Sequence, residues 1–355
     1  MHNRIGMVVV GTGFGSAVHL PALRDSEHFQ VVGVCGRDLE RTKQSAQEFA
    51  VPHYGDRLED LLNLPEVQAV SITTPPFLHY AQAKACLLAG KHVFLEKPVT
   101  MCVAEAEELQ RLAEERGLVI GIDFEFRCVP HWQFFHDLLR RGEAGQLRLI
   151  LLEWLVAGRA NPHRRWNWYS QRACGGGALG ALASHSFDYL HWLFGDLKLV
   201  SAHLSTAIKS RPDAEAVLQP VDSDDTCNLV LELGDGTPIY ANISTVAYHG
   251  VGHWLTVYGD RATLAIGSGN LKDYVHGFQV FQGEAGQESW QCLELPASYQ
   301  FAKTYPDGRI APVKAVLERF AEAVLHGKPM IPSIREGIVS QSLIDRALTL
   351  SDLRC

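Results

Sequence analysis

Six residues near the start of the chain have the composition and spacing of a phosphate-binding turn. They follow a β-branched apolar run and are Gly11, Thr12, Gly13, Phe14, Gly15 and Ser16. The first glycine permits a tight turn, and the second lets the backbone approach a pyrophosphate, which the N–H groups of a helix N-terminus attract. Ser16 stands where a third glycine is usual, and its small side chain is compatible with close helix–strand packing. The spacing therefore predicts a dinucleotide-binding turn between a strand and a helix.

The end of the second predicted strand, Val31–Cys35, indicates which dinucleotide binds. NAD-binding domains usually place Asp or Glu here to hold the ribose 2′-hydroxyl. This chain has Gly36 and Arg37 instead, with Arg41 close behind. Guanidinium groups pair with a 2′-phosphate, which a carboxylate would repel. We therefore expect NADP(H) in preference to NAD(H). Two alternatives stay open: Asp38 could reach a ribose, and the cations could be solvated charges at an exposed helix start.

Lys97 lies between Glu96 and Pro98 at the end of the predicted strand Val93–Leu95. In a doubly wound sheet the nicotinamide is expected at this carboxyl edge. A lysine there can give or take the proton that accompanies hydride transfer, with a pKa lowered by burial and by the cofactor's charge. Glu96 could bond the nicotinamide ribose or orient Lys97, and the Lys97–Pro98 bond is a candidate cis bond. Taken alone, such a tripeptide is more typical of a helix approach with solvated charges.

Strand-like and helix-like segments alternate through the first third of the chain. Short apolar runs occur at residues 7–10, 31–35, 69–73, 93–95 and 119–122, with helical stretches at 16–23, 39–49, 80–89 and 103–116. This alternation is typical of a parallel sheet covered by helices on both faces. The last of these helices is predicted to have Thr100 as its N-cap and to end at Gly117.

The pattern changes after about Asp123. Strand-like runs follow one another at residues 147–156, 200–208, 226–233, 238–246, 254–258 and 262–266. The pair Asp235–Gly236 is typical of a hairpin turn. Successive strands favour an antiparallel sheet in an α+β domain. Two helices, at about 312–326 and 333–353, are predicted to end the chain.

Several motifs together resemble the Gfo/Idh/MocA family of NAD(P)-dependent oxidoreductases. The matching stretches cover essentially the whole chain and are the glycine turn, Thr74-Pro75-Pro76 with His79, Ala89 through Glu96-Lys97-Pro98, Gly175 through His185 to Asp188, and Phe320 to Ser351. The resemblance implies an α/β fold with a Rossmann doubly wound parallel sheet over residues 1–123. It implies a C-terminal α+β domain over residues 124–355, with a large open, mostly antiparallel sheet; the last helices could pack back toward the Rossmann domain. It also implies bound NAD(P), a sugar or polyol substrate, Lys97 as the proton-transfer lysine, and a cofactor surrounded by Thr74, Pro75, His79 and Glu96.

Position 181 departs from the family pattern. Relatives commonly carry Asp four residues before the histidine of the second-domain motif, whereas this chain has Ala181 before His185. Asp and His at i and i+4 share a helix face and can present a hydrogen-bonded pair to a substrate alcohol. We therefore expect proton transfer to rest on Lys97, with His185 holding the substrate oxygen or acting as a second base. Asp188 could partly substitute, but a structural bond inside its own helix is the preferred interpretation.

Three further residues are candidates for substrate contacts: Arg127, Arg164 and Trp166. Arg127 follows the fifth strand, where it would either shape the cleft or form an interdomain salt bridge with Glu125 or a neighbour. Arg164 and Trp166 belong to the run His163–Tyr169, whose guanidinium groups and polar-tipped aromatics suit a sugar ring or a carboxylated substrate. In the alternative interpretation the tryptophans fill the domain interface and the arginines face solvent.

Composition argues against several other classes of protein. The 355 residues carry a net charge of −8 with both signs mixed along the chain, which disfavours a nucleic-acid partner. No apolar run approaches the ~20 residues of a membrane helix. The first residues run almost directly into a strand, which leaves no room for a secretory signal, so we expect a cytoplasmic protein. The 8 cysteines include no C-x-x-C pair and the 16 histidines show no metal-ligand spacing, so we expect buried thiols and no metal site.

These observations predict an NADP(H)-preferring oxidoreductase. It would transfer hydride to or from a hydroxyl or carbonyl carbon, with a sugar, polyol or related small molecule as substrate and Lys97 as proton donor or acceptor. Two alternatives remain: an NAD-recycling glycosidase or epimerase, and a nucleotide-binding regulator without turnover. Because a sheet with one uncovered face exposes apolar area, we also expect a homodimer or homotetramer formed through that face.

Overall fold

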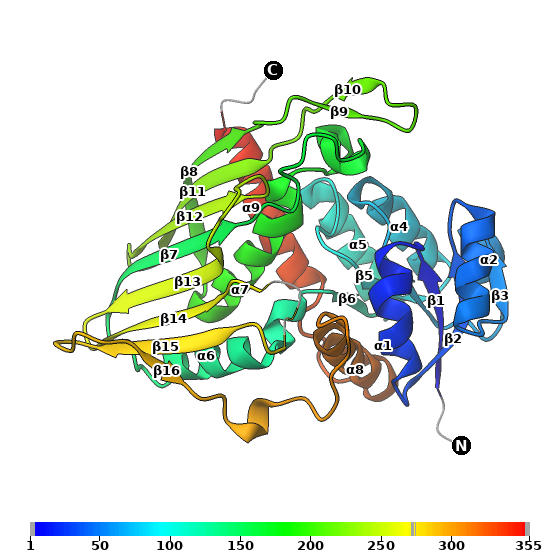
Figure 1. Ribbon diagram of the computed structural model, residues 1–355. Helices are drawn as coiled ribbons and strands as arrows, with labels where there is room; N and C mark the ends of the chain where they lie inside the picture. The colour runs from blue at the N-terminus through cyan, green and yellow to red at the C-terminus, as the bar shows by residue number, and fades with distance from the viewer. Residues whose placement is uncertain (1–3, 271–272, 274, 352–355) are drawn as a thin grey trace. The chain divides into compact units, whose positions relative to one another are not determined.

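The chain divides into two compact units (Figure 1). The computed structural model describes residues 4–270, 273 and 275–351. The N-terminal unit consists of residues 1–125 and 309–341, and the C-terminal unit consists of residues 126–308 and 342–355. Residues 309–341 therefore belong with the N-terminal unit, although they lie near the end of the chain.

A six-stranded parallel sheet forms the centre of the N-terminal unit, in the order β3-β2-β1-β4-β5-β6. Its strands are β1 (Ile5–Val10), β2 (Phe29–Cys35), β3 (His53–Gly55), β4 (Ala69–Ile72), β5 (His92–Leu95) and β6 (Ile120–Ile122). All six residues of β1 are buried, as expected for a central strand with both faces covered. The order reverses direction beside β1, between β2 and β4, which is where a doubly wound sheet places a ligand at its carboxyl edge.

Helices cover both faces of this sheet. They are η1 (Gly15–His19), α1 (Leu20–Arg24), α2 (Leu39–Glu48), α3 (Leu58–Leu62), η2 (Pro76–Leu78), α4 (His79–Leu88), α5 (Val103–Arg116) and α8 (Ile310–His326). Apolar side chains of α3, α4 and α5 share one core cluster with the strands. On the other face, the Phe320 ring of α8 stacks on the Phe29 ring and packs against the Phe94 ring. The distances between ring centres are 6.5 Å to Phe29 and 5.6 Å to Phe94.

An eight-stranded sheet forms the C-terminal unit, in the order β16-β15-β14-β13-β7-β12-β11-β8. The strands are β7 (Leu147–Leu155), β8 (Leu197–Ser205), β11 (Thr226–Leu233), β12 (Pro238–Ser244), β13 (Gly252–Gly259), β14 (Ala262–Ser268), β15 (Gln279–Glu284) and β16 (Gln291–Leu293). Only β7 and β12 pair in parallel among the neighbours in this sheet, so the expected mostly antiparallel sheet is confirmed. A separate hairpin of β9 (Ser210–Pro212) and β10 (Leu218–Pro220) completes the described strands.

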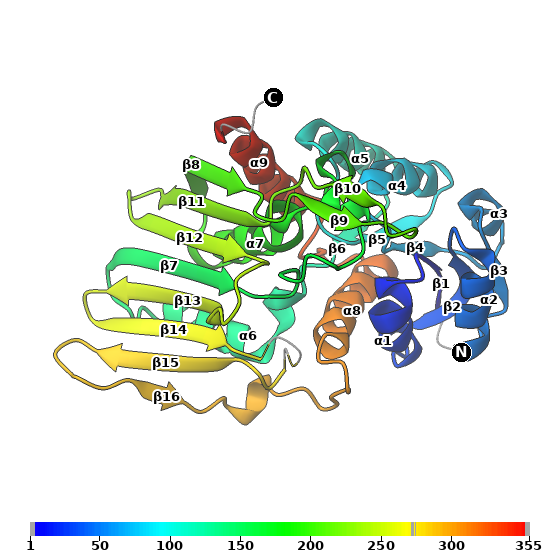
Figure 2. The same cartoon turned by 45° about the horizontal axis from the view of Figure 1, so that its top comes forward.

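Helices pack on one face of the eight-stranded sheet (Figure 2). The helical segments of this unit are η3 (Glu125–Cys128), α6 (Pro130–Arg140), η4 (Trp168–Ser170), η5 (Arg172–Cys174), η6 (Leu179–Ala183), α7 (Ser184–Phe194) and η7 (Ala297–Tyr299). The first residue of η3 belongs to the N-terminal unit. The second half of α9 (Ile334–Leu350) also belongs to the C-terminal unit. Trp132 of α6 and Phe187 of α7 are buried against the strands. Along β12, Ile239, Ala241 and Ile243 face this core, and the alternating side chains point to the other face.

Several local predictions differ from the structure. The N-cap of α5 is Cys102, while Thr100 donates its hydroxyl to the Cys102 carbonyl oxygen, so the predicted cap was wrong. Gly117 does end α5, with φ +64°. The final helix ends at Leu350, and residues 352–355 lie outside the described part of the chain. Short edge strands such as β3 and β16 were missed because three residues leave too brief a periodic signal.

The cysteines follow the expectation in part. Cys35, Cys86, Cys128 and Cys227 are buried thiols, but Cys292 is exposed; Cys355 lies outside the described residues. In the described part of the chain, no helix is both long and apolar enough to cross a membrane.

Candidate active site

The glycine turn is packed tightly on one side and open on the other. Gly11 has φ +109°, and a Cβ at this position would lie 2.5 Å from Thr73 Oγ1, so only glycine fits. A Cβ on Gly15 would lie 2.9 Å from Val9 Cγ1, which shows close helix–strand contact there. A Cβ on Gly13 would meet no heavy atom within 4 Å. The backbone at Gly13 is thus accessible to a ligand, as a pyrophosphate requires.

Ser16 has a different contact from the one its place in the motif suggested. Its hydroxyl lies 2.6 Å from the hydroxyl of Ser45 on α2, while Gly15 makes the close approach to β1. The residues Gly15–His19 form a π-helical turn, η1, before α1 begins. Such turns are frequent at functional sites.

The cations after β2 are arranged at the same edge of the sheet. Asp38 accepts a hydrogen bond from the backbone N–H of Arg41 at 3.1 Å and so caps α2, which gives this carboxylate a structural role. The Arg41 guanidinium donates to the carbonyl oxygen of Thr12 at 2.9 Å and therefore lies against the glycine turn. The Arg37 side chain is exposed to solvent. Both guanidinium groups follow the strand whose end holds the ribose in dinucleotide-binding folds.

His79 joins the segments that follow β4 and β5. Its ring is fully buried, with Nδ1 2.8 Å from the Pro98 carbonyl oxygen and Nε2 2.7 Å from the Thr74 carbonyl oxygen. Burial lowers the pKa of His79, while the two carbonyl groups oppose that shift. Thr74 donates its hydroxyl to Gln82 Oε1 at 2.6 Å. His79 therefore connects Thr74, which follows β4, with Pro98, which follows Lys97 beyond β5.

Lys97 lies where the sequence predicted, directly beyond β5. Its side chain is half-buried, and the Lys97–Pro98 bond is cis, as expected. The adjacent Glu96 accepts a hydrogen bond from His19 Nε2 at 2.9 Å. Glu96 is thus held by a residue of η1, so the glycine-turn helix and the lysine strand are directly connected.

His19, Glu96 and Asp123 form a buried charged cluster at the carboxyl edges of β5 and β6. His19 Nε2 lies 3.3 Å from Asp123 Oδ2, and His19 Nδ1 lies 2.8 Å from Ser71 Oγ. The three residues are 0%, 8% and 1% exposed. Neither Asp123 oxygen accepts a well-aligned hydrogen bond. Glu96 is adjacent to Lys97 in sequence, and the Lys97 charge lowers the pKa of Glu96.

Opposing effects determine the protonation of this cluster. Burial by itself lowers the pKa of His19, but the Asp123 and Glu96 carboxyl groups outweigh burial and raise it to about 9. Burial and the Glu96 charge raise the pKa of Asp123 to about 7. Burial would raise the pKa of Glu96, yet the hydrogen bond from His19, with the His19 and Lys97 charges, lowers it. At neutral pH, His19 is therefore a cation paired with the Glu96 anion.

A third buried acid, Glu125, adjoins the cluster. Burial, followed by the Asp123 charge, raises the pKa of Glu125 well above its ordinary value, although the Lys97 charge opposes the shift. These effects favour the neutral form of the Glu125 carboxyl group. His19, Glu96 and Asp123 each place a metal-ligand atom within 4.8 Å of the others, a grouping that the linear spacing did not predict. In this structure His19 Nε2 lies 2.9 Å from Glu96 Oε1 and 3.3 Å from Asp123 Oδ2, so these side chains form an ion-pair network.

His19 and Asp123 were missed by the sequence analysis. One signal was available: Asp123 directly follows β6, so it must lie at the same carboxyl edge as Glu96 and Lys97. His19 gave no comparable signal, because a histidine on an apolar helix face is more often a core residue.

The segment that carries His185 begins with another π-helical turn. Gly177 has φ +110° and packs against Asp224, whose carboxylate accepts from the Leu179 N–H at 2.8 Å. Burial raises the pKa of Asp224 to about 6. Residues Leu179–Ala183, including Ala181, form the π-helical turn η6, and α7 begins one residue before His185. His185 is 5% exposed, and its ring lies edge-on to Phe126 at 5.1 Å.

Arg127 and Asp188 pair with one another inside the C-terminal unit. Arg127 Nε lies 2.9 Å from Asp188 Oδ2, and Nη2 lies 2.7 Å from Oδ1, in a buried bidentate ion pair. The sequence did not suggest this partner for Asp188, a guanidinium that reaches it from η3. With both oxygens bound by Arg127, Asp188 is a poor substitute for the carboxylate missing at position 181.

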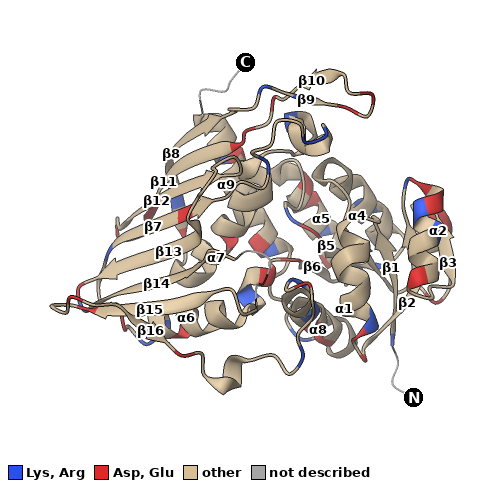
Figure 3. Cartoon of the chain, viewed as in Figure 1, with Lys and Arg blue, Asp and Glu red and all other residues tan. Residues whose placement is uncertain are grey.

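Arg164 and Trp166 lie in the long loop between β7 and η6. Arg164 is exposed and donates to the Gly158 carbonyl oxygen at 2.6 Å. The Trp166 indole N–H donates to the Pro220 carbonyl oxygen at 2.9 Å, which attaches the loop to the β9–β10 hairpin. Figure 3 shows basic residues along the short helical turns near β9.

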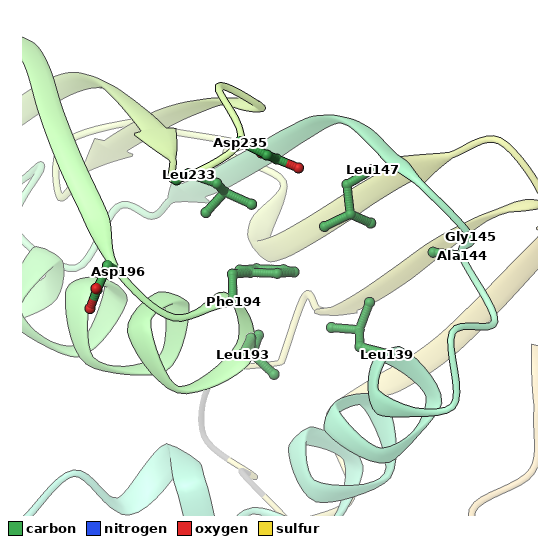
Figure 4. Close-up of a pocket in the computed structure, with 10 residues that line it drawn as sticks. Leu139, Ala144, Gly145, Leu147, Leu193, Phe194, Asp196, Leu233 and Asp235 are labelled. Atoms are coloured by element: carbon green, nitrogen blue, oxygen red, sulfur yellow. The ribbon is translucent and has the colours of Figure 1, made fainter.

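A cavity of about 520 Å³ lies in another part of the C-terminal unit (Figure 4). It is lined mainly by leucines with Phe194, and two aspartates, Asp196 and Asp235, lie at its edge. Its wall includes the start of β7, whereas the loop with Arg164 follows the end of that strand. None of the predicted site residues lines this cavity.

Comparisons with known proteins agree with the two-domain fold. Residues 5–124 match the family model described as oxidoreductase family, NAD-binding Rossmann fold, and residues 136–351 match the C-terminal α/β domain of the same family. The chain is 49% identical over 341 residues to an uncharacterized oxidoreductase of Synechocystis sp., covering 96% of this chain and 92% of the relative. It is 29% identical over 214 residues to an NADP⁺-dependent scyllo-inositol 2-dehydrogenase of Bacillus subtilis, covering 60% of this chain and 57% of the relative.

Solved structures show the same fold. A levoglucosan dehydrogenase in complex with NADH and L-sorbose superimposes with a TM-score of 0.85 at 20% identity, covering 98% of this chain and 96% of the other.

Proposed function

The chain belongs to the Gfo/Idh/MocA oxidoreductase family, and from this premise we propose that it is an NADP(H)-preferring enzyme acting on a sugar, polyol or related small molecule. One observation carries the proposal. Lys97 lies at the carboxyl edge of β5, in the same parallel sheet whose β1 edge opens onto the accessible backbone of Gly13. A proton-transfer group and a dinucleotide turn thus share the edge at which such sheets bind ligands.

The residues of this edge fit a dinucleotide. The Gly11–Ser16 turn would hold the pyrophosphate, Arg37 and Arg41 the 2′-phosphate, and the segment Thr74–Pro75 the nicotinamide end. Bound NAD(P) supplies the hydride acceptor or donor. In the oxidative direction the substrate C–H bond breaks, a C=O bond forms, and the hydroxyl proton passes to the amine of Lys97. In the C-terminal unit, His185 is the group proposed to hydrogen-bond the substrate.

The preference for NADP(H) rests on Arg37 and Arg41. Asp38 accepts a hydrogen bond from the Arg41 backbone N–H and caps α2, which supports a structural role for the carboxylate near the end of β2. We predict that Arg37→Ala raises the Kd for NADPH about tenfold and leaves the Kd for NADH unchanged, since a charged hydrogen bond contributes about 1.5–3 kcal/mol. Fluorescence titration with both nucleotides measures this. Arg57→Ala, which removes another exposed arginine, is the matched control. An equal loss for both nucleotides would contradict the preference.

The glycine turn offers a second test. We predict that Gly13→Ala keeps the melting temperature but weakens nucleotide binding tenfold or more, because the added methyl group meets no protein atom and faces the ligand. Gly15→Ala should instead destabilise the fold by roughly 1–3 kcal/mol, because its methyl group would overlap Val9 and Thr73. Thermal unfolding and titration separate the two effects. Unchanged binding by the Gly13→Ala protein would remove the turn from the cofactor site.

Two other functions are tested beside this one: an NAD-recycling glycosidase or epimerase, and a nucleotide-binding regulator, which Ala181 in place of the usual Asp supports. The experiment that separates them releases any nucleotide by denaturation, identifies it by mass, and then follows NADP⁺ reduction with a panel of polyols and sugars. Little retained nucleotide with net NADP⁺ reduction supports the dehydrogenase. Copurified NAD(H) with no net change during turnover supports the recycling enzyme, and tight NADPH binding without any hydride transfer supports the regulator.

We also propose that a second copy covers the face of the eight-stranded sheet opposite α6 and α7. Tyr240 and Val200 are 45% and 40% exposed in this sheet. A sheet face without helices commonly becomes a symmetric interface. Sedimentation at the mass of one 39.3 kDa chain would contradict this proposal.

A further inference from the structure

The loop between β7 and η6 is strongly basic in an acidic chain. No Asp or Glu occurs between Glu153 and Asp188, although the whole chain holds 40 acidic residues. The same stretch contains four arginines, Arg159, Arg164, Arg165 and Arg172. Such a separation of charge within one loop indicates a local positive potential.

Arg211 of β9 adds another guanidinium to this loop. Its side chain is only 3% exposed, and it donates to the carbonyl oxygens of Asn161 at 2.7 Å and Arg159 at 2.6 Å. These two bonds shape the backbone of the loop around a buried cation. Asp225 is the acidic residue whose charge acts on Arg211, but its carboxylate accepts from the backbone N–H groups of Ala207 and Ile208.

Arg159 is the most constrained cation of the group. Its guanidinium carbon lies 3.3 Å from the centre of the Tyr169 ring, which fixes the plane of the fork. Its Nη1 atom is buried and has no hydrogen-bond partner among the described residues, and the same holds for the neighbouring Ser170 hydroxyl. Burial lowers the pKa of Arg159 to about 10, and the Arg164 and Arg211 charges act in the same direction. A buried donor without a partner destabilises a fold, and more so when it is charged.

These guanidinium groups lie close to one another without a carboxylate in ion-pair contact. Among the described residues, no ion pair joins Arg159, Arg164 or Arg211 to an acid. Three like charges are thus held close together by backbone carbonyls and an aromatic ring. An oxyanion would relieve their repulsion, because its charge offsets theirs and a guanidinium fork matches carboxylate and phosphate oxygens.

We propose that this loop, with Arg159, Arg164 and Arg211, binds the oxyanion of the substrate, which is therefore a sugar or polyol bearing a carboxylate or phosphate group. The inference rests on the proposed function, because the loop leads directly into the Gly175–Gly177 run and the helix that carries His185. Trp166 and Trp168 belong to the same loop and offer flat faces to a sugar ring.

The test compares charged and neutral probes of one skeleton. D-glucuronate, D-glucose 6-phosphate and D-glucose are titrated into the full-length protein by calorimetry and are then assayed with NADP⁺. We expect an acidic probe to bind at least about tenfold more tightly than glucose, and we expect Arg159→Gln to remove that advantage while leaving the glucose affinity unchanged. The better of the two acidic probes identifies the anion as carboxylate or phosphate. Arg148→Gln, at an exposed position of β7, is the matched control.

Two further measurements keep the outcomes distinct. Arg164→Gln changes an exposed residue and should weaken binding of the acidic probe even if Arg159→Gln does not fold. Rising NaCl should raise the KM of an acidic substrate and not that of a neutral one. Anion binding that depends on these arginines, without any turnover, would refute the proposed function and support the oxyanion site. Turnover of neutral polyols with no preference for the acidic probes would refute the oxyanion site and support the proposed function.

Discussion

The Lys97→Met protein is expected to lose turnover by at least about a hundredfold while it binds NADPH as tightly as the unchanged chain. Methionine retains most of the length and volume of lysine but cannot carry a proton, and general acid–base groups commonly contribute 10²–10⁴-fold. The loss should appear in kcat and in kcat/KM alike, because the proton moves only in the transition state. Initial rates of NADP⁺ reduction and a fluorescence titration of NADPH measure the two quantities separately.

Two variants control this experiment. Lys91→Met changes another half-buried lysine near the opposite end of β5, where Nζ donates to the Val67 carbonyl oxygen at 2.7 Å, and it should keep full activity. Lys97→Arg keeps the positive charge, but arginine does not release its proton at neutral pH, so it should also lose activity. Full turnover by Lys97→Met would sink the assignment of this lysine. Loss of NADPH binding would instead make it a cofactor ligand.

Much of the N-terminal unit could be predicted because its signals are local. The Gly11–Ser16 turn, the buried run of β1 and the Lys97–Pro98 bond each depend on residues adjacent in sequence. Local chemistry also predicted Gly117 at the end of α5, where a left-handed conformation is needed. The family resemblance is confirmed over both units, and so is the α/β fold class.

The remaining features depend on contacts between residues far apart in sequence. Asp188 was expected to bond within α7, but its partner Arg127 is 61 positions away. Glu96 was expected to orient Lys97 or bind a ribose, and its observed partner His19 is 77 positions away. Thr100 has the residue type of an N-cap, yet the chain enters α5 through Cys102. Residue type alone could not select these partners, because each depends on which segments the fold brings together.

The cluster around His19 connects the stability of the N-terminal unit to the environment of Lys97. The Lys97 charge lowers the pKa of Glu96 and opposes the rise at Glu125, so the lysine and the buried acids affect one another. His19 compensates the Glu96 charge directly beside Lys97, the residue proposed to transfer the proton.

Replacement of His19 by glutamine is expected to lower the free energy of unfolding by about 3 kcal/mol near pH 6, because removing one partner of a buried ion pair leaves an uncompensated charge.

The loss of stability in the His19→Gln protein should depend on pH. The folded-state pKa of His19 is raised from 6.5 to about 9, so the stability it provides is fully present below about pH 6.5 and is lost as the pH rises through 9. The folded-state pKa of Asp123 is raised from 3.8 to about 7, so its contribution to stability also falls as the pH rises, from about pH 4 to 7. The difference in free energy of unfolding between the two proteins should therefore be largest near pH 6 and should narrow toward pH 9.

Urea unfolding of both proteins at pH 6, 7.5 and 9 measures this difference. His53→Gln, which removes a half-exposed histidine paired with Glu66, should show no such trend. A gap of constant size across this range would mean that His19 contributes packing alone and that its charge does not stabilise the cluster.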